Sequence, residues 1–244
     1  MRLAVLSDIH GNAEALDACL DHAAELGVDG YVFLGDLVGY GPDPERVVDI
    51  VADMSGQGAI VVKGNHDEAI ERGTDQMNGP AADAIRWTRD QLDASQKAFL
   101  AQLPMTLMRD DVMFVHASAA RPERWPYIDS IASAIACFVA SSARVTICGH
   151  THVPELFHQL PGGQMETLEP PANSKVPFSN ARRYLGVLGA VGQPRDGDAR
   201  ACWGLLESDG LTYCRVAYDI EKTRRKINAA GLPSWLGERL TIGH

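Results

Sequence analysis

The sequence contains few cysteines for its 244 residues, and none of them belongs to a C-x-x-C pair. They are odd in number and widely scattered, at Cys19, Cys137, Cys148, Cys202 and Cys214. This pattern argues against a disulfide framework and against a cysteine-based redox site. It is typical of small buried hydrophobic side chains in a protein of a reducing compartment.

Basic residues and long apolar runs are also scarce. Lys and Arg number 22 against 32 Asp and Glu, which gives a net charge of −10. A nucleic acid duplex and an anionic membrane surface both require clustered basic charge, so we expect neither as a partner. The N-terminal apolar stretch is interrupted at Asp8, too early for a signal peptide, and no segment approaches the roughly 20 apolar residues of a membrane span. We therefore expect a cytoplasmic protein, and the sequence leaves its oligomeric state open.

The first sixty residues alternate short apolar runs with helical patterns. Strands are predicted at 2–7, 30–34 and 59–62, where apolar and β-branched residues are bounded by polar residues or glycine. A helix is predicted over 12–26 with Asn12 as its N-cap, and another helix follows the second strand. This rhythm predicts parallel strands with helices packed over them.

The chain then continues as helix up to about residue 103 and mainly as strands beyond it. A helical pattern over 80–103 is interrupted near Ser95, which we interpret as the cap of its second half. A later helix over 129–141 is expected to begin at Asp129. The apolar side chains that it is expected to turn inward are Ile131, Ile135, Phe138 and Val139. The other predicted elements are strands at 105–108, 112–115, 145–148, 154–160, 164–168, 185–189, 201–207 and 211–217, and a helix at 219–229.

Together these elements predict one α/β domain over residues 1–244. The expected architecture is a four-layer α-β-β-α sandwich, in which two stacked mixed sheets are flanked by helices. The stretch 169–183 combines prolines with polar residues and is long for a connection, so we expect it to form a flap.

Five of the eight histidines stand in short polar segments that directly follow predicted strands. The segments are Asp8-Ile9-His10-Gly11-Asn12, Gly35-Asp36, Gly64-Asn65-His66-Asp67, Val115-His116-Ala117 and Gly149-His150-Thr151-His152. The carboxyl ends of parallel strands lie along one edge of the sheet, where ligands bind, so these distant segments are expected to meet. The other three histidines, His22, His158 and His244, are interpreted as surface or structural residues.

The ordered set D-x-H, G-D, G-N-H-D, a single H and G-H-x-H resembles the calcineurin-like metallophosphoesterase superfamily. The compact spacing, with Gly-Asp-Leu-Val-Gly-Tyr-Gly-Pro around Asp36, is similar to its small single-domain prokaryotic branch. The resemblance continues through Gly-Gln-Pro-Arg-Asp-Gly-Asp at 192–198 and Gly-Leu-Pro at 231–233, so it covers nearly the whole chain.

The resemblance implies two metal sites that share one carboxylate. The first site would be held by Asp8, His10, Asp36 and His152, and the second by Asp36, Asn65, His116 and His150. Imidazole and oxygen donors without a thiolate suit Mn²⁺, Fe or Zn²⁺. Two divalent ions outweigh the two aspartates and leave a centre of about +2 that attracts phosphate. Ions roughly 3.5–4 Å apart can share a hydroxide at neutral pH and clamp both oxygens of an in-line displacement.

Two residues are expected to take part in catalysis beside the metal ions. In the family, the residue equivalent to His66 faces the substrate, where it acts as a general acid or donates to a phosphate oxygen. Asp67 is expected to orient the imidazole of His66.

Substrate contacts outside the metal ions are expected at Arg195 and Asn12. A guanidinium binds phosphate in a bidentate manner, but the alternative for Arg195 is an ion pair with Asp196 or Asp198. Three aromatic residues, Tyr40, Trp125 and Tyr127, could stack on a nucleobase or simply pack at the rim.

The resemblance thus implies a metal-dependent enzyme that hydrolyses a phosphate mono- or diester of a small molecule by attack of a metal-bridging hydroxide. The alternatives are a nucleotide pyrophosphohydrolase of the dinucleoside polyphosphate type, a cyclic phosphodiesterase, or a non-catalytic scaffold that binds metal and a partner. The protein Ser/Thr phosphatases carry G-D-x-V-D-R-G around the bridging Asp, whereas this chain has Gly39-Tyr40-Gly41 at the last three positions. Because that phosphate-clamping arginine is missing, we do not expect a phosphoprotein substrate.

Overall fold

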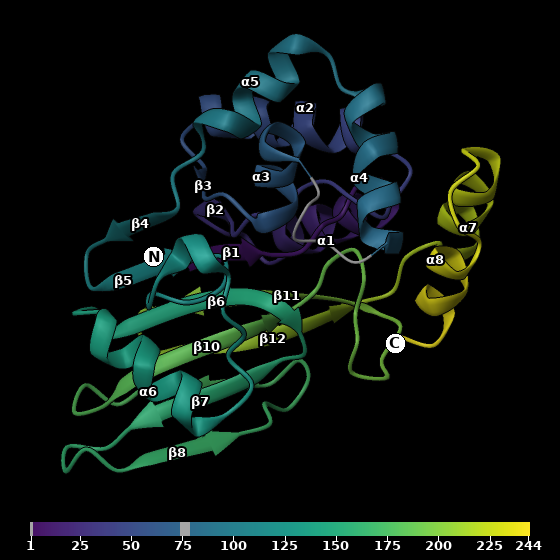
Figure 1. Cartoon of the computed structure of the whole chain (residues 1–244). Helices are drawn as coiled ribbons and strands as arrows, with labels where there is room; N and C mark the ends of the chain where they lie inside the picture. The colour runs from purple at the N-terminus through teal and green to yellow at the C-terminus, as the bar shows by residue number, and fades with distance from the viewer. Residues whose placement is uncertain (1, 74–78) are drawn as a thin grey trace.

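Two mixed sheets of six strands each lie face to face in this computed structural model, which describes residues 2–73 and 79–244 (Figure 1). The first sheet has the strand order β3-β2-β1-β11-β12-β9, and the second has β4-β5-β6-β10-β7-β8. In the first sheet β1, β2 and β3 run parallel, whereas β11 is antiparallel to β1. In the second sheet β6 runs parallel to both β5 and β10.

The strands of both sheets follow the predicted positions closely. Those of the first sheet are β1 (Arg2–Leu6), β2 (Gly30–Phe33), β3 (Ile60–Val61), β9 (Lys175–Pro177), β11 (Ala201–Glu207) and β12 (Gly210–Val216). Those of the second sheet are β4 (Thr106–Arg109), β5 (Val112–Val115), β6 (Val145–His152), β7 (Glu155–Gln159), β8 (Met165–Leu168) and β10 (Arg183–Gly189). The short strand β9 was not predicted.

The apolar side chains of β1 alternate between two cores. Leu3 and Val5 point into the space between the sheets, where residues such as Phe114 of β5 meet them. Ala4 and Leu6 belong to the core on the other side of the first sheet. A strand buried on both faces requires this two-residue alternation, and it reads in the sequence as an uninterrupted apolar run.

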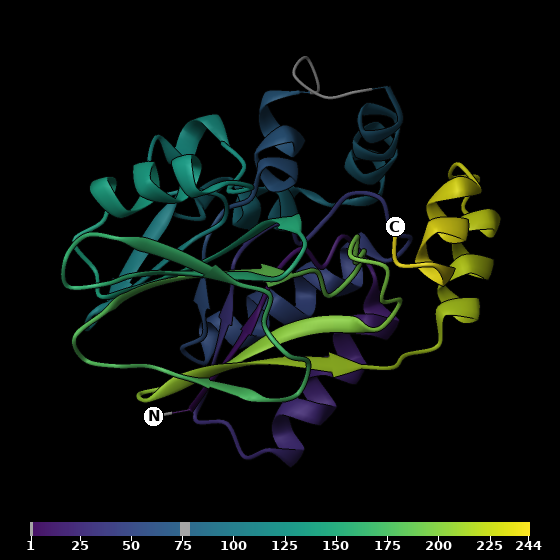
Figure 2. The same cartoon turned by 90° about the horizontal axis from the view of Figure 1, so that it is seen from below.

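Helices cover both outer faces of the paired sheets, as predicted for a four-layer sandwich. Helices α1 (Ala13–Glu25), α2 (Pro44–Gly56) and α5 (Ala94–Gln102) pack on the first sheet. Helix α6 (Ile131–Ala140) packs on the second sheet. Figure 2 shows α6, in teal, and α1, in purple, on opposite sides of the sheets.

The remaining helices lie beside the sandwich. They are α3 (Asn65–Arg72), α4 (Gly79–Gln91), α7 (Ile220–Ala229), α8 (Trp235–Glu238) and the single turns η1 (Pro122–Arg124) and η2 (Arg239–Thr241). A separate apolar cluster joins Ala84 of α4 to Ile227 of α7 and Leu236 of α8. Among the described residues, no helix is both long and apolar enough to span a bilayer.

Two predicted helix caps and one predicted helix face are wrong. The cap of α5 is Asp93, whose carboxylate accepts from the Gln96 amide, and Ser130 caps α6 in the same manner. Helix α6 turns Ile131, Ile135 and Val139 outward, with exposed fractions of 45%, 44% and 83%. It buries Phe138, as predicted, together with Ala134 and Cys137, which were not predicted. Because the helix is apolar on both sides, helical periodicity could not select the buried face.

The stretch 169–183 is a sheet edge and not a flap over the predicted site. It contributes β9, which pairs antiparallel with β12 at the edge of the first sheet. It ends in Arg183 at the first residue of β10, whose guanidinium donates to the carbonyls of Phe138, Ser141 and Ala143. The predicted metal ligands follow the carboxyl ends of the strands, so this stretch lies at the opposite end of β10.

Candidate metal centre

The seven predicted metal ligands converge at the edge between the two sheets. Asp8 and His10 follow β1, Asp36 follows β2, and Asn65 begins α3 just after β3. From the second sheet, His116 follows β5, and His150 and His152 end β6. All seven are buried except Asn65, which is half-buried. The parallel direction of these strands within each sheet brings the segments together, as the sequence predicted.

The backbone at this edge adopts conformations that L-residues rarely occupy. Five of the ligands have a positive φ: Asp8 (56°), His10 (50°), Asp36 (50°), His150 (69°) and His152 (63°). Such residues cost about 1–3 kcal/mol each and gather at functional sites. The neighbouring glycines make room for them, since a Cβ on Gly149 would lie 2.4 Å from Asp8 Oδ2 and one on Gly64 would lie 2.1 Å from Asp36 Oδ1.

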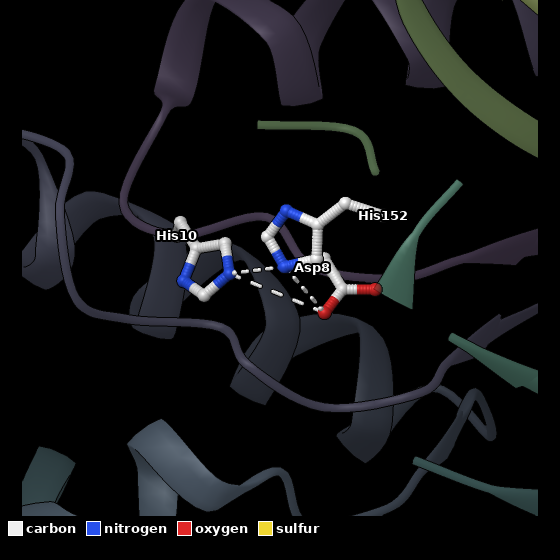
Figure 3. Close-up of side chains that lie close together, drawn as sticks. All are labelled: Asp8, His10 and His152. Atoms are coloured by element: carbon white, nitrogen blue, oxygen red, sulfur yellow. Dashed lines mark hydrogen bonds and ion pairs between the residues drawn. The ribbon is translucent and has the colours of Figure 1, made fainter. Parts of the chain in front are cut away.

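The first ligand cluster consists of Asp8, His10 and His152 (Figure 3). Nε2 of His152 lies 3.2 Å from Nε2 of His10 and 3.3 Å from Oδ1 of Asp8. Nδ1 of His10 donates to the Val38 carbonyl (3.1 Å) and Nδ1 of His152 to the Gln193 carbonyl (2.7 Å), because a carbonyl can only accept. In neutral rings both Nε2 atoms are therefore acceptors. Oδ1 of Asp8 is buried and has no hydrogen-bond donor, so all three atoms fit a cation.

The second ligand cluster is built around His116. Its Nε2 lies 3.1 Å from His150 Nδ1, 3.2 Å from Asn65 Oδ1 and 3.4 Å from Asp36 Oδ2. Its Nδ1 donates to the Leu34 carbonyl at 2.9 Å, which turns Nε2 toward these acceptors. Such carbonyl contacts fix the ring of a metal-binding histidine.

Asp36 lies between the two clusters. Its Oδ2 is 3.7 Å from His10 Nε2 on one side and 3.4 Å from His116 Nε2 on the other. Its Oδ1 accepts from the His66 amide at 2.8 Å, which holds the carboxylate in this orientation. Asp36 is thus placed to serve both clusters.

The charges at the centre favour a cation. Burial favours a neutral Asp36, but His116 and His66 outweigh it and hold the pKa of this carboxyl well below its usual range. Burial likewise favours a neutral His116, yet Asp36 and Asp8 raise the pKa of its imidazole to about 9. The donors are nitrogen and oxygen without sulfur, a set that fits Mn²⁺, Fe or Zn²⁺.

His66 lies against the first cluster. Its ring is edge-on to that of His10, with centroids 4.8 Å apart, and 4.6 Å from the ring of Tyr40. Its Nδ1 is buried without a hydrogen-bond partner. Burial lowers the pKa of His66 to about 4, against the opposing effect of Asp36.

Asp67 does not orient His66 as predicted. Its two oxygens accept from the amides of Leu37 and Gly64, each at 2.9 Å. The carboxylate therefore ties the loop after β2 to the start of α3, and each of its oxygens accepts from a main-chain amide. Burial, with Asp36 nearby, raises the pKa of Asp67 to about 7.

Asn12 does not face a substrate either. It caps α1, as predicted, by accepting from the Ala15 amide (3.2 Å). Its Oδ1 also accepts from the Thr223 hydroxyl (3.1 Å), and its Nδ2 donates to the Gly192 carbonyl (2.9 Å) and to the Tyr218 hydroxyl (3.3 Å). The side chain is 1% exposed, so its polar atoms are used inside the fold.

Comparison with known proteins identifies the family. The profile of the calcineurin-like phosphoesterase superfamily domain matches residues 1–207. The chain belongs to this superfamily.

Two similar proteins match it over nearly its full length, and a third over about two thirds. An uncharacterised protein of Methanocaldococcus jannaschii is 34% identical over 251 aligned residues, which cover 99% of this chain and 98% of that protein. The crystal structure of a metallophosphoesterase from Sphaerobacter thermophilus is 37% identical with a TM-score of 0.87, and the match covers 100% of this chain and 99% of that one. Phosphodiesterase YfcE of Escherichia coli is 27% identical over 176 residues, 66% of this chain and 78% of YfcE. The chain is thus a hydrolase of phosphoric ester bonds in a metal-dependent family.

In this calcineurin-like phosphoesterase, Arg195 lies beside the metal centre. Its amide donates to the His152 carbonyl at 3.3 Å, and its Nη2 donates to Oε1 of Gln193 at 3.0 Å. The alternative ion pair with Asp196 or Asp198 is not formed, because these carboxylates pair with Arg215 and Arg200.

The aromatic residues of the phosphoesterase flank both clusters. Tyr40 packs against His10 with ring centroids 4.7 Å apart. Tyr127 stacks on His150, with centroids 4.3 Å apart and planes 20° apart, and is 53% exposed. Trp125 meets His116 edge-on and donates from Nε1 to Glu68 at 3.1 Å. These contacts support the rim-packing interpretation.

Sequence reasoning missed the groups that orient the ligands. The carbonyls of Leu34, Val38 and Gln193 receive the three Nδ1 donors. A main-chain acceptor is present at every position, so no side-chain signal could have marked these three.

Proposed function

We propose that this phosphoesterase hydrolyses a phosphate mono- or diester of a small molecule with two metal ions held by the clusters described above. The observation that carries the proposal is the position of Asp36, whose Oδ2 lies within 3.7 Å of His10 Nε2 and 3.4 Å of His116 Nε2. One carboxylate oxygen between two imidazole groups is suited to bridge two ions. The name of the E. coli relative, a phosphodiesterase, supports a diester among the substrates.

The first site would use Asp8, His10, Asp36 and His152, and the second Asp36, Asn65, His116 and His150. A bound pair of divalent ions supplies Lewis acidity at a phosphoryl oxygen and hydroxide at neutral pH. The net charge of the chain is −10, so the ions would also provide the local positive charge that attracts the ester.

His66 is the proposed catalytic residue of the chain itself. Burial keeps its pKa at about 4, so the imidazole is neutral at physiological pH and carries one N–H. This favours donation of a hydrogen bond to a phosphoryl or leaving-group oxygen over proton transfer from an imidazolium. Arg195 is proposed to contact the substrate outside the metal ions.

The test is turnover of bis-p-nitrophenyl phosphate and of p-nitrophenyl phosphate by protein loaded with Mn²⁺. We expect hydrolysis that disappears with a chelator and returns when Mn²⁺ is restored, and the Asp36→Asn variant serves as the inactive control. If neither ester is hydrolysed while metal is bound stoichiometrically, the chain is a scaffold and the proposed reaction is wrong.

A further inference from the structure

The His150 imidazole is held differently from the other three histidines of the two clusters. His10, His116 and His152 each donate from Nδ1 to a main-chain carbonyl and turn Nε2 toward the centre. His150 is turned the other way, with its Nδ1 3.1 Å from Nε2 of His116. In the part of the chain that the structure describes, Nε2 of His150 has no hydrogen-bond partner. Such a partner normally fixes the ring of a metal-binding histidine, so the orientation of this ring needs another cause.

The main-chain contacts of His150 do not supply this cause. Its amide donates to Oδ2 of Asp8 at 3.0 Å, and its φ is 69°. Both features fix the backbone, whereas the last torsion of a histidine side chain is broad and turns independently. His116 meets the ring edge-on, with centroids 4.9 Å apart and planes 65° apart, which leaves the two faces of the ring open.

Tyr127 covers one of these faces. Its ring stacks on that of His150, with centroids 4.3 Å apart and planes 20° apart. It is 53% exposed and belongs to none of the apolar clusters of the described residues, so core packing does not account for its position. The contact is made by the aromatic ring and not by the hydroxyl. Offset stacking of this kind favours one relative orientation of two rings.

The connection between β5 and α6 holds Tyr127 in place on both sides. The next residue, Ile128, is buried in the apolar cluster of Phe138. Two residues before Tyr127, Trp125 has a φ of 52° and donates from Nε1 to Glu68 of α3 at 3.1 Å. A positive φ is an outlier for so bulky a side chain, and such strain gathers at functional sites. The loop is therefore fixed before any ligand binds.

We propose that Tyr127 is a positioning residue of the second metal site. Its ring holds the His150 imidazole in the orientation that presents Nδ1 to the ion, in the role that a carbonyl has for the other three histidines. The inference rests on the proposed function, because it assigns a metal ion to the second cluster. It also gives the exposed loop between β5 and α6 a part in metal binding.

The test isolates each metal site before Tyr127 is changed. His10→Ala breaks the first site, so the Mn²⁺ affinity of this variant, measured by chelator competition, reports on the second site. Adding Tyr127→Leu should weaken this binding by about three- to tenfold, because the stacked ring is lost. Adding Tyr127→Phe instead keeps the ring and should leave the affinity unchanged.

The control uses His116→Ala, in which the second site is broken and Mn²⁺ binding reports on the first. Here Tyr127→Leu should have no effect. Because Tyr127 is half exposed, its variants are expected to fold, and their melting temperatures check this. Equal affinities for the leucine and phenylalanine variants, or the same loss at both sites, would overturn the positioning role.

Kinetics distinguish this role from a contact with the substrate. If Tyr127→Leu keeps its Mn²⁺ affinity and raises KM for p-nitrophenyl esters alone, Tyr127 binds the aryl group and the positioning role is wrong. The affinity measurements need no turnover. If the Mn²⁺-loaded wild type hydrolyses neither ester, the proposed reaction fails, and the affinities still decide the role of Tyr127.

Discussion

Nε2 of His10 faces Nε2 of His152 at 3.2 Å, and no hydrogen bond can join them when both rings are neutral, because Nδ1 of each ring already carries its proton toward a carbonyl. Burial lowers the pKa of His10 well below its ordinary value, which keeps its ring neutral. Two lone pairs at this distance repel, so the surrounding main chain holds the arrangement in place. A pair of ligands positioned in this way loses little freedom when it binds a cation.

The shared carboxylate predicts that two substitutions differ in their effect on metal content. Asp36→Asn removes the charged oxygen that lies between the clusters, so both ions should be lost together. His10→Ala removes a ligand of the first cluster only, and should lower metal content to about half. Elemental analysis of the purified variants measures the difference. His158→Ala, a histidine paired with Glu166 away from the site, is the control and should keep full metal content. Equal loss in the Asp36 and His10 variants would contradict the bridging assignment.

His66 should affect the rate and not the metal. We expect His66→Ala to retain both ions and to lose about 10²–10³ in kcat, because the variant lacks a donor to the phosphoryl group. Steady-state kinetics with bis-p-nitrophenyl phosphate, together with metal analysis of the same preparation, separates the two effects. Unchanged turnover at full metal content would remove His66 from the mechanism.

The convergence of the candidate ligands could be predicted because it depends on residue type and topology, whereas their division into two metal sites was implied by the family resemblance. Asp8 and His152 are far apart in the sequence, but Asp8 follows β1 of the first sheet and His152 ends β6 of the second, and both strands end at the same edge of the two facing sheets. The four layers follow from the same alternation of strands and helices. The conformation that aims each ligand was signalled only by the adjacent glycines, such as Gly64 and Gly149.

The predictions that were wrong concern features that depend on tertiary contacts. Asp67 follows His66 directly, yet its carboxylate binds two main-chain amides that only the folded loops bring within reach. The sequence of α6 offers two apolar faces, and the second sheet selects the one with Phe138 and Cys137. The polar stretch 169–183 resembles a flap because β9 is only three residues long and pairs with a strand far along the chain.

The hydrogen bonds of Asn12 predict that helix α7 influences the first ligand cluster. Oδ1 of Asn12 accepts a hydrogen bond from the Thr223 hydroxyl of α7, and its Nδ2 donates to the Gly192 carbonyl. The next residue, Gln193, supplies the carbonyl that accepts from Nδ1 of His152. Thr223→Val should therefore weaken metal binding by about tenfold to 100-fold, as is typical for groups that orient a ligand. Chelator competition measures the affinity.

Thr223→Ser is the matched control, because it keeps the hydroxyl. Its metal affinity should stay close to that of the wild type. Asn12→Asp gives an independent check: it retains the acceptor for the Ala15 amide but lacks the donor to Gly192, so it should bind metal weakly although α1 remains capped. Equal affinities for the valine and serine variants would exclude this connection.

The buried thiols predict a loss of stability at alkaline pH. Burial raises the pKa of Cys202 from 9.0 to about 11, whereas the unfolded chain keeps the ordinary value. Below pH 9 the thiol is neutral in both states, and between about pH 9 and 11 only the unfolded state loses the proton. The free energy of unfolding should thus fall as pH rises, by about 1.4 kcal/mol per pH unit for this thiol. Urea titrations of Cys202→Ala should show a slope that is smaller by that amount over this interval. An unchanged slope would mean that the thiol ionises in the folded protein as readily as in the unfolded chain.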